Sequence, residues 1–155
     1  MIPPEKTNIS TADTLILVVD DEEYIRRLVA RNLMEHGYSC VLAESGAVAL
    51  AELAAHPFPL IITDLMMPGM TGLELLTAAK QVQPDIAVVM LTGVDSSATA
   101  VVALAQGAYG YVIKPFQSNE LLINVVNALR RRELEILHRP CPNPHIPIIE
   151  RGWLK

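Results

Sequence analysis

The sequence is poor in aromatic residues and in cysteine, and both shortages limit the kind of protein it encodes. Aromatic residues make up only 5% of the 155 residues, although 51% are hydrophobic, so the core must be built from Val, Ile, Leu, Ala and Met. The two cysteines, Cys40 and Cys141, lie far apart in the chain. They fit a reducing compartment and argue against a disulfide framework. A chain of this length is expected to form one domain with a sizeable core.

A surplus of positive charge is also missing. The formal net charge is −5 and the pI is near 5.3, which argues against a nucleic-acid-binding surface. The only dense basic run, 130–132, is followed at once by Glu133 and Glu135, which favours a solvated helix face. No segment is long and apolar enough to span a bilayer, and the N-terminus lacks a signal sequence. We therefore predict a cytoplasmic protein that contacts neither nucleic acid nor a membrane.

Five apolar segments alternate with helical patterns along most of the chain. Strands are expected at 15–19, 38–43, 60–64, 86–91 and 109–113, and helices at about 21–36, 45–54, 71–82, 96–105 and 118–137. Repeated strand-then-helix units with short loops predict an α/β fold with a doubly wound five-stranded parallel sheet and five helices. The domain is expected to span 15–137. It is flanked by a flexible tail at 1–14 and a proline-rich tail at 138–155.

Chemically active side chains stand at the ends of four predicted strands. The first strand ends in Asp20 and Asp21, the third in Asp64, the fourth in Thr92 and the fifth in Lys114. Each acid taken alone could be a helix cap or a loop residue, but in a doubly wound sheet all these ends share one edge. An all-oxygen site suits Mg²⁺, a carboxylate can accept a phosphoryl group, and a hydroxyl and an ammonium can bind phosphoryl oxygens.

The motifs VVDDEE, TDLMMPGMTGLELL, MLTG and GYVIKPF, each at the end of a predicted strand, resemble those of a two-component response regulator receiver domain. The resemblance covers about 15–133. It implies the flavodoxin-like receiver fold with strand order 2-1-3-4-5. It also implies that a sensor histidine kinase or a phosphotransfer protein phosphorylates Asp64, with Mg²⁺ as the cofactor.

The resemblance also assigns roles to individual residues around the acceptor. Asp64 would be both phosphorylation site and metal ligand, and Asp21 would bind the metal directly. Asp20 would act mainly through water, and Met66 would offer its backbone carbonyl to the metal. Such a domain speeds only its own phosphorylation and dephosphorylation, so its role is signalling and not metabolic catalysis.

Three more residues match the switch elements of the family. Thr92 matches the switch hydroxyl, Tyr111 the switch aromatic and Lys114 the phosphate-binding lysine, with a cis peptide bond between Lys114 and Pro115. A strand tyrosine is ordinarily only a half-buried packing residue, and Pro115 could be an ordinary trans proline. Phosphorylation would move Thr92, turn Tyr111 inward and change the surface formed by the fourth helix, fifth strand and fifth helix.

Other classes of protein fit the sequence less well. A Mg²⁺-dependent phosphatase of related fold typically needs a second acid two residues after its nucleophile, where this chain has Met66, and no cap domain is present. A flavodoxin-like binding module would need a Gly- or Ser/Thr-rich phosphate loop after the first strand, where this chain has acids. A degenerate receiver that acts only as an interaction module is less favoured, because the acid set is intact. The sequence does not identify the output, the kinase, the stimulus or the oligomeric state, or whether the chain stands alone.

Two expectations concern residues beyond the acceptor site. In the family that this chain resembles, the residues two after the acceptor Asp and two after the switch Thr flank the path of the attacking water. Here these are Met66 and Val94, neither of which can orient a water by hydrogen bonding, so we expect slow loss of the phosphoryl group. We also expect the fifth helix to run past the domain body as a connector, since Leu122, Leu129 and Ile136 recur at heptad spacing. A charged, frayed helix end is the alternative.

The fourth predicted helix carries no charge and is apolar on every side. A surface helix needs only one apolar stripe. We expect Val101, Leu104 and Ala105 to face the sheet, and Ala100 and Ala103 to point away from it. The surplus apolar surface would then join the fifth strand and fifth helix in a contact face, with a homodimer as the expected partner. Small alanines could also leave little patch at all.

Overall fold

The computed structural model describes residues 14–93 and 97–138. Its strands form one parallel sheet in the order β2-β1-β3-β4-β5, which confirms the predicted sheet and strand order. The strands are β1 (Leu15–Val19), β2 (Ser39–Ala43), β3 (Leu60–Asp64), β4 (Ala87–Thr92) and β5 (Gly110–Ile113). Val94, Cys141 and nearly all of the two predicted tails (1–13 and 139–155) lie outside the described residues, and the domain limits at 15 and 137 stay predictions.

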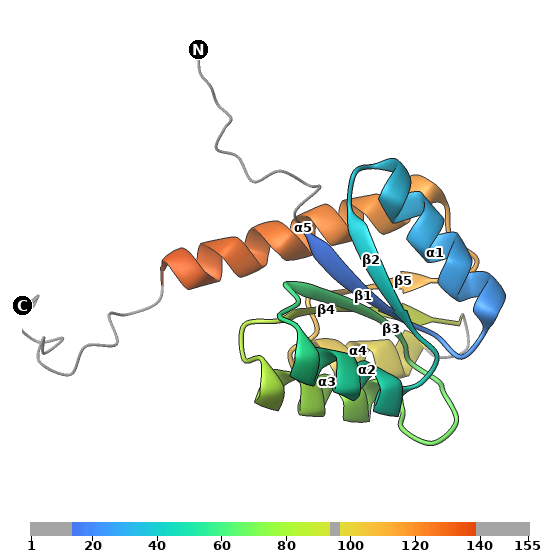
Figure 1. Cartoon of the computed structure of the whole chain (residues 1–155), viewed down its shortest axis with the longest axis horizontal. Coiled ribbons are helices and arrows are strands. Elements are labelled where there is room, and N and C mark those ends of the chain that lie inside the picture. The colour runs from blue at the N-terminus through green and yellow to red at the C-terminus, as the bar shows by residue number, and fades with distance from the viewer. Residues whose placement is uncertain (1–13, 94–96, 139–155) are drawn as a thin grey trace, which may run out of the picture.

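Five helices cover the two faces of this sheet (Figure 1). They are α1 (Glu23–Glu35), α2 (Gly46–Ala55), α3 (Gly72–Val82), α4 (Ser97–Ala105) and α5 (Ser118–Leu137). Helices α1 and α5 lie on one face, and α2, α3 and α4 lie on the other. The C-terminal part of α5 runs past the sheet, as expected, but its role as a connector stays a prediction.

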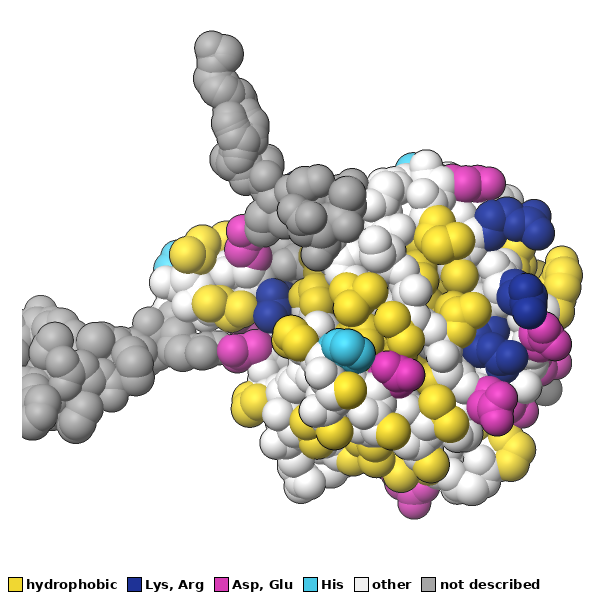
Figure 2. All heavy atoms as spheres, viewed as in Figure 1, with side chains coloured by type: hydrophobic (Ala, Val, Ile, Leu, Met, Phe, Trp, Pro, Cys, Tyr) yellow, Lys and Arg dark blue, Asp and Glu magenta, His cyan; other side chains and the backbone are white. Residues whose placement is uncertain are grey.

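The surface shown in Figure 2 mixes charges of both signs. Lys and Arg side chains lie among Asp and Glu side chains around α1 and form no continuous basic area on this face. Among the described helices, none combines the length and the apolar character needed to cross a membrane.

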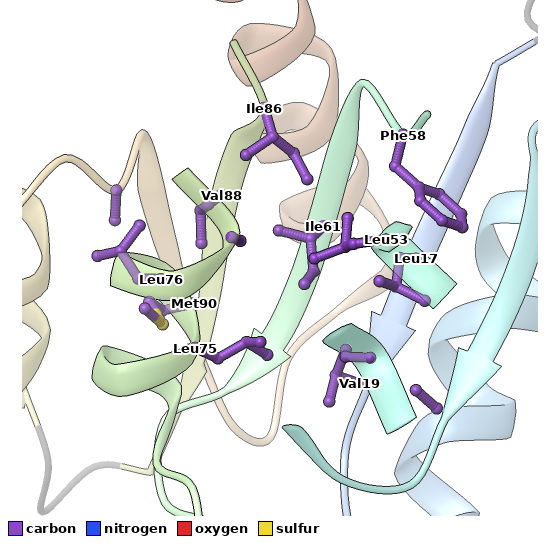
Figure 3. Packing of buried hydrophobic residues seen from close by; sticks show 14 of the residues in the cluster. Leu17, Val19, Leu53, Phe58, Ile61, Leu75, Leu76, Ile86, Val88 and Met90 are labelled. Carbon is purple, nitrogen blue, oxygen red and sulfur yellow. The ribbon is translucent and has the colours of Figure 1, made fainter. Parts of the chain in front are cut away.

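The core consists of two layers, one on each face of the sheet. Successive residues of a strand point to opposite faces, so Leu17 packs toward α2 and α3 while Val18 packs toward α1 and α5. Figure 3 shows the first layer, where Leu53 of α2 lies against Ile61 of β3 and Leu75 of α3 belongs to the same cluster. Both layers are mostly aliphatic, as the low aromatic content predicts. Strands that are covered on both faces have nearly continuous apolar sequences, which is why these strands could be predicted from the sequence.

The start of α3 is fixed by two local features next to the end of β3. Thr71 caps the helix: its hydroxyl accepts from the Glu74 backbone N–H at 3.2 Å, and the Glu74 carboxylate accepts from the Thr71 N–H at 3.0 Å. At Gly72 a β-carbon would lie 2.5 Å from the backbone oxygen of Asp64. Glycine therefore lets the helix begin directly against the strand end that carries Asp64.

The predicted orientation of α4 is wrong. Ala100 and Ala103 are fully buried, whereas Val101 is 58% and Leu104 is 39% exposed, and Ala105 is exposed as well. Because every side of this helix is apolar, its periodicity could not single out the buried stripe, and the larger side chains were wrongly placed inward. The small side chains of Ala100 and Ala103 instead form the contact with the sheet. The exposed apolar surface is therefore larger than predicted.

Candidate functional site

The structure brings four of the predicted site residues together at the C-terminal edge of the sheet. Oxygen atoms of Asp20, Asp21 and Asp64 all lie within 4.8 Å of one another. The Lys114 Nζ atom lies 3.3 Å from Asp20 Oδ2 and 3.4 Å from Asp64 Oδ1. These residues follow or end β1, β3 and β5, so the parallel sheet itself brings them together.

Both carboxylate oxygens of Asp20 accept hydrogen bonds. Its side chain is fully buried, Oδ1 accepts from the Glu22 backbone N–H at 2.8 Å, and Oδ2 accepts from Lys114. Burial raises the pKa of Asp20, and the Glu22 N–H and Lys114 oppose this rise. Asp21, by contrast, is exposed. Arg26 was not predicted as a site residue. Its Nη1 donates to the Asp20 carbonyl oxygen at 2.7 Å, and its position near the start of α1 was the available signal.

Asp64 is only 6% exposed, and its environment disfavours a negative charge. Burial and the nearby carboxylate of Asp20 raise the pKa of Asp64 to about 6, although Lys114 and the Met66 N–H work against this rise. Burial also disfavours the charged form of Lys114, but the carboxylates of Asp64 and Asp20 together outweigh it and raise the pKa of Lys114. The site therefore holds more negative charge than its single lysine neutralises.

Thr92 and Tyr111 lie on the same face of the sheet. Thr92 is fully buried at the end of β4, and its hydroxyl donates to the Gly93 carbonyl oxygen at 3.1 Å. Tyr111 pairs with Met90, two residues before Thr92, and packs half-buried against the core on the α2–α3 side. The alternation of β-strands therefore points the side chains of Thr92 and Tyr111 to the same side.

The two remaining predicted features are backbone features. The peptide bond between Lys114 and Pro115 is cis, the isomer that the resemblance implied. Met66 is 60% exposed, and its N–H lies 3.4 Å from Asp64 Oδ1. Metal binding by its carbonyl stays a prediction.

The donor set fits a hard divalent cation. Three carboxylates converge, and oxygen is the ligand atom that Mg²⁺ prefers. Three carboxylates face a single ammonium in this cluster, so a bound cation would balance the excess negative charge. The exposed Asp21 leaves one side of the cluster open to solvent.

Comparison with known proteins gives a consistent result. The family described as "response regulator receiver domain" matches residues 16–126. The nitrogen assimilation regulatory protein NtrX of Azorhizobium caulinodans is 40% identical over 136 residues, covering 84% of this chain and 30% of that protein. The DNA-binding transcriptional regulator NtrC of Escherichia coli K12 is 37% identical over 115 residues, covering 74% of this chain and 24% of that protein. The chain thus spans less than a third of these two relatives.

Solved structures agree with these sequence matches. The receiver domain of NtrX from Brucella abortus superimposes with a TM-score of 0.72 and 38% identity, covering 74% of this chain and 98% of that one. A response regulator receiver domain protein from Clostridium thermocellum gives a TM-score of 0.73 and 32% identity, covering 78% of this chain and 98% of that one.

Proposed function

Because this chain belongs to the family of response regulator receiver domains, we propose that Asp64 accepts a phosphoryl group from a histidine kinase or a phosphotransfer protein. One observation carries the proposal. Asp64 ends the central strand β3 and faces Asp20, Asp21 and Lys114 within a few ångströms. In the transfer, an Asp64 carboxylate oxygen forms a bond to phosphorus while the bond from phosphorus to the donor's histidine nitrogen breaks.

The surrounding residues would have two roles: some would hold a divalent cation, and Lys114 would bind a phosphoryl oxygen. Asp21, Asp64 and the Met66 carbonyl would hold a divalent cation directly, and the buried, fully bonded Asp20 would act on it through water. When bound, Mg²⁺ supplies positive charge for the phosphoryl oxygens. Lys114 would bind another of these oxygens, exchanging part of its contact with Asp64 for one with the phosphoryl group.

The hydroxyl of Thr92 would respond to phosphorylation of Asp64 by changing its hydrogen-bond partner. It now donates to the Gly93 carbonyl, and a phosphoryl group on Asp64 would offer it stronger, charged acceptors. Its movement would leave space beside Tyr111, which lies on the same face of the sheet. Phosphorylation would thereby shift the population of conformations at the surface of α4, β5 and α5.

This α4–β5–α5 face also carries the most suitable contact surface for a second copy of the chain. Exposed apolar side chains on these three elements include Val101, Val102, Leu104, Ile113 and Ile123. The corrected orientation of α4 strengthens the proposal, because its larger side chains face solvent. Apolar surface of this kind on one face often marks an interaction site.

Two further expectations remain proposals for this chain. Nucleic-acid contact is not expected, because its formal net charge is −5. The DNA-binding name of the NtrC relative belongs to a much longer protein. Slow loss of the phosphoryl group is expected because Met66 cannot hydrogen-bond the attacking water through its side chain; a lifetime of only seconds would contradict this.

Phosphorylation of the purified chain tests the proposal. The protein is incubated with Mg²⁺ and a small phosphodonor such as acetyl phosphate, and its intact mass is measured. We expect one added phosphoryl group in the original chain and in the Asp85→Asn control, and none in Asp64→Asn. A modification that survives in Asp64→Asn would show that Asp64 is not the acceptor.

A further inference from the structure

A second cluster of charged side chains lies at the N-terminal ends of the strands, opposite the C-terminal ends where Asp64 stands. Tyr109 directly precedes β5. The Lys80 Nζ atom lies 4.9 Å from the centre of its ring, and the guanidinium carbon of Arg131 lies 4.1 Å from it. The Tyr109 hydroxyl donates to Glu135, which also accepts from Arg131 Nε at 3.0 Å. These four residues are called the Tyr109 clamp.

The clamp connects the two helical layers of the fold. Lys80 belongs to α3, while Arg131 and Glu135 belong to α5, and these helices cover opposite faces of the sheet (Figure 1). Lys80 is itself fixed, because its Nζ donates to the Ile86 carbonyl at 2.9 Å. One aromatic ring therefore holds cations from both layers, and cation–π attraction is favourable at this range.

The clamp lies beyond the last fully buried residue of α5. That residue is Ala128 in a helix of 20 residues; Leu129 still packs against the core from a half-buried position. No side chain of 131–137 is fully buried. A helix end with so little burial opens easily, yet α5 continues to Leu137. Polar contacts hold this end: the clamp, and Arg132 Nε, which donates to the Asp85 carbonyl at 2.9 Å.

We propose that the Tyr109 clamp is a strap that holds the last two turns of α5 to the domain body and fixes the direction in which this helix leaves it. Tyr109 leads directly into β5, which carries Tyr111. A shift of β5 would therefore be passed to the end of α5 through the ring of Tyr109. The strap does not depend on Asp64 being the acceptor.

The protonation states of the clamp suit this role. Burial and the hydrogen bond to Glu135 raise the pKa of Tyr109 to about 12, so the phenol keeps its proton and remains a donor at neutral pH. Hydrogen bonds from Tyr109 and Arg131 lower the pKa of Glu135, which keeps this acceptor charged.

Amide hydrogen exchange of the full chain tests the strap, with Lys80→Gln as the decisive variant. Lys80 lies on α3, so this change leaves the sequence and helix propensity of α5 untouched. We expect exchange at 131–137 to become about two- to fivefold faster, the equivalent of one cation–π contact, with exchange at 121–128 unchanged. Lys80→Arg keeps a cation and should restore slow exchange.

Two variants at tyrosines complete the experiment. Tyr109→Leu should loosen 131–137 more than Lys80→Gln does, while Tyr24→Leu, at a 74% exposed tyrosine of α1, should leave it unchanged. Unchanged exchange at 131–137 in a folded Lys80→Gln protein would overturn the proposal. Equal acceleration at 121–128 and 131–137 would overturn it too, because Lys80 and Tyr109 would then support only the general packing. If Tyr109→Leu does not fold, the comparison of Lys80→Gln with Lys80→Arg alone tests the proposal.

Discussion

The Nζ atom of Lys114 lies 3.4 Å from the carboxylate of Asp64, and this contact joins the ends of β5 and β3 across β4. Lys114 is also 3.3 Å from Asp20. One largely buried ammonium thus sits between two buried carboxylates. Without it the two acids, whose pKa values are already raised, would face each other unneutralised.

The first prediction concerns this lysine. Lys114→Met should lower the free energy of unfolding at pH 7.5 by about 1–3 kcal/mol, because it leaves two buried carboxylates without their cation. Urea unfolding in EDTA measures the loss. Arg27→Met is the control: its ion pair with Glu23 is exposed, so its loss should cost no more than about 0.5 kcal/mol. Equal effects of the two changes would contradict the electrostatic role of Lys114.

The second prediction is a pH dependence caused by Asp64. Its pKa rises from 3.8 to about 6 on folding, so between these values the folded state binds more protons than the unfolded state. The contribution of Asp64 to stability is therefore present below pH 4 and lost as the pH rises through 6. In EDTA at pH 7.5, Asp64→Asn should be more stable than the original chain by about 3 kcal/mol.

The gain from Asp64→Asn should shrink as the pH falls. Urea unfolding at pH 4.5 and 7.5 gives both values, and Mg²⁺ should stabilise the original chain at pH 7.5 more than the variant. A gain that is the same at both pH values would show that the charge on Asp64 is not the cause.

The third prediction uses two glycines near the site. Gly72→Ala places a β-carbon 2.5 Å from the Asp64 carbonyl oxygen and 2.8 Å from Leu65 Cα. These are backbone atoms that cannot move without displacing the loop, so we expect a loss of about 1–3 kcal/mol and weaker phosphorylation. At Gly93 a β-carbon meets nothing within 4 Å, so thermal unfolding of Gly93→Ala should be nearly unchanged. Similar losses in both variants would contradict the close-approach explanation.

The fourth prediction concerns self-association through the α4–β5–α5 face. Beryllium fluoride, a mimic of the phosphoryl group, should shift the chain toward a dimer, and Val101→Glu should prevent this without loss of stability, since Val101 is 58% exposed. Met34→Glu, at an exposed position of α1, should still dimerise. Light scattering gives the mass in solution. A monomer in both states would show that self-association through this face is wrong.

The clustering of the candidate site residues could be predicted from the sequence because it depends on strand ends. Runs such as Leu15–Val19 are recognisable by their continuous apolar character, and a parallel sheet then brings their ends to one edge. The cluster of Asp20, Asp64 and Lys114 follows from that topology. The orientation of α4 does not, because a helix that is apolar on every side gives no periodic signal.

Contacts that depend on tertiary packing were not predictable in the same way. No sequence pattern distinguishes Gly72, because its importance arises only where α3 meets the backbone of Asp64. Lys80, Tyr109 and Arg131 lie in three separate elements, and no motif joins them. The hydrogen bond from Arg26 to the Asp20 carbonyl lies between these cases: the two residues are close in sequence, but Asp20 precedes α1 and no helical spacing joins them.

The central claim is that Asp64 carries the phosphoryl group, and locating the modified residue chemically tests it most directly. After phosphorylation with Mg²⁺ and acetyl phosphate, borohydride reduces an aspartyl phosphate to homoserine, which peptide mass spectrometry can place in the chain. The structure predicts homoserine at position 64 and unmodified aspartate at positions 20, 21 and 85. Homoserine at position 20 or 21, or none anywhere in a chain that has gained a phosphoryl group, would contradict the account.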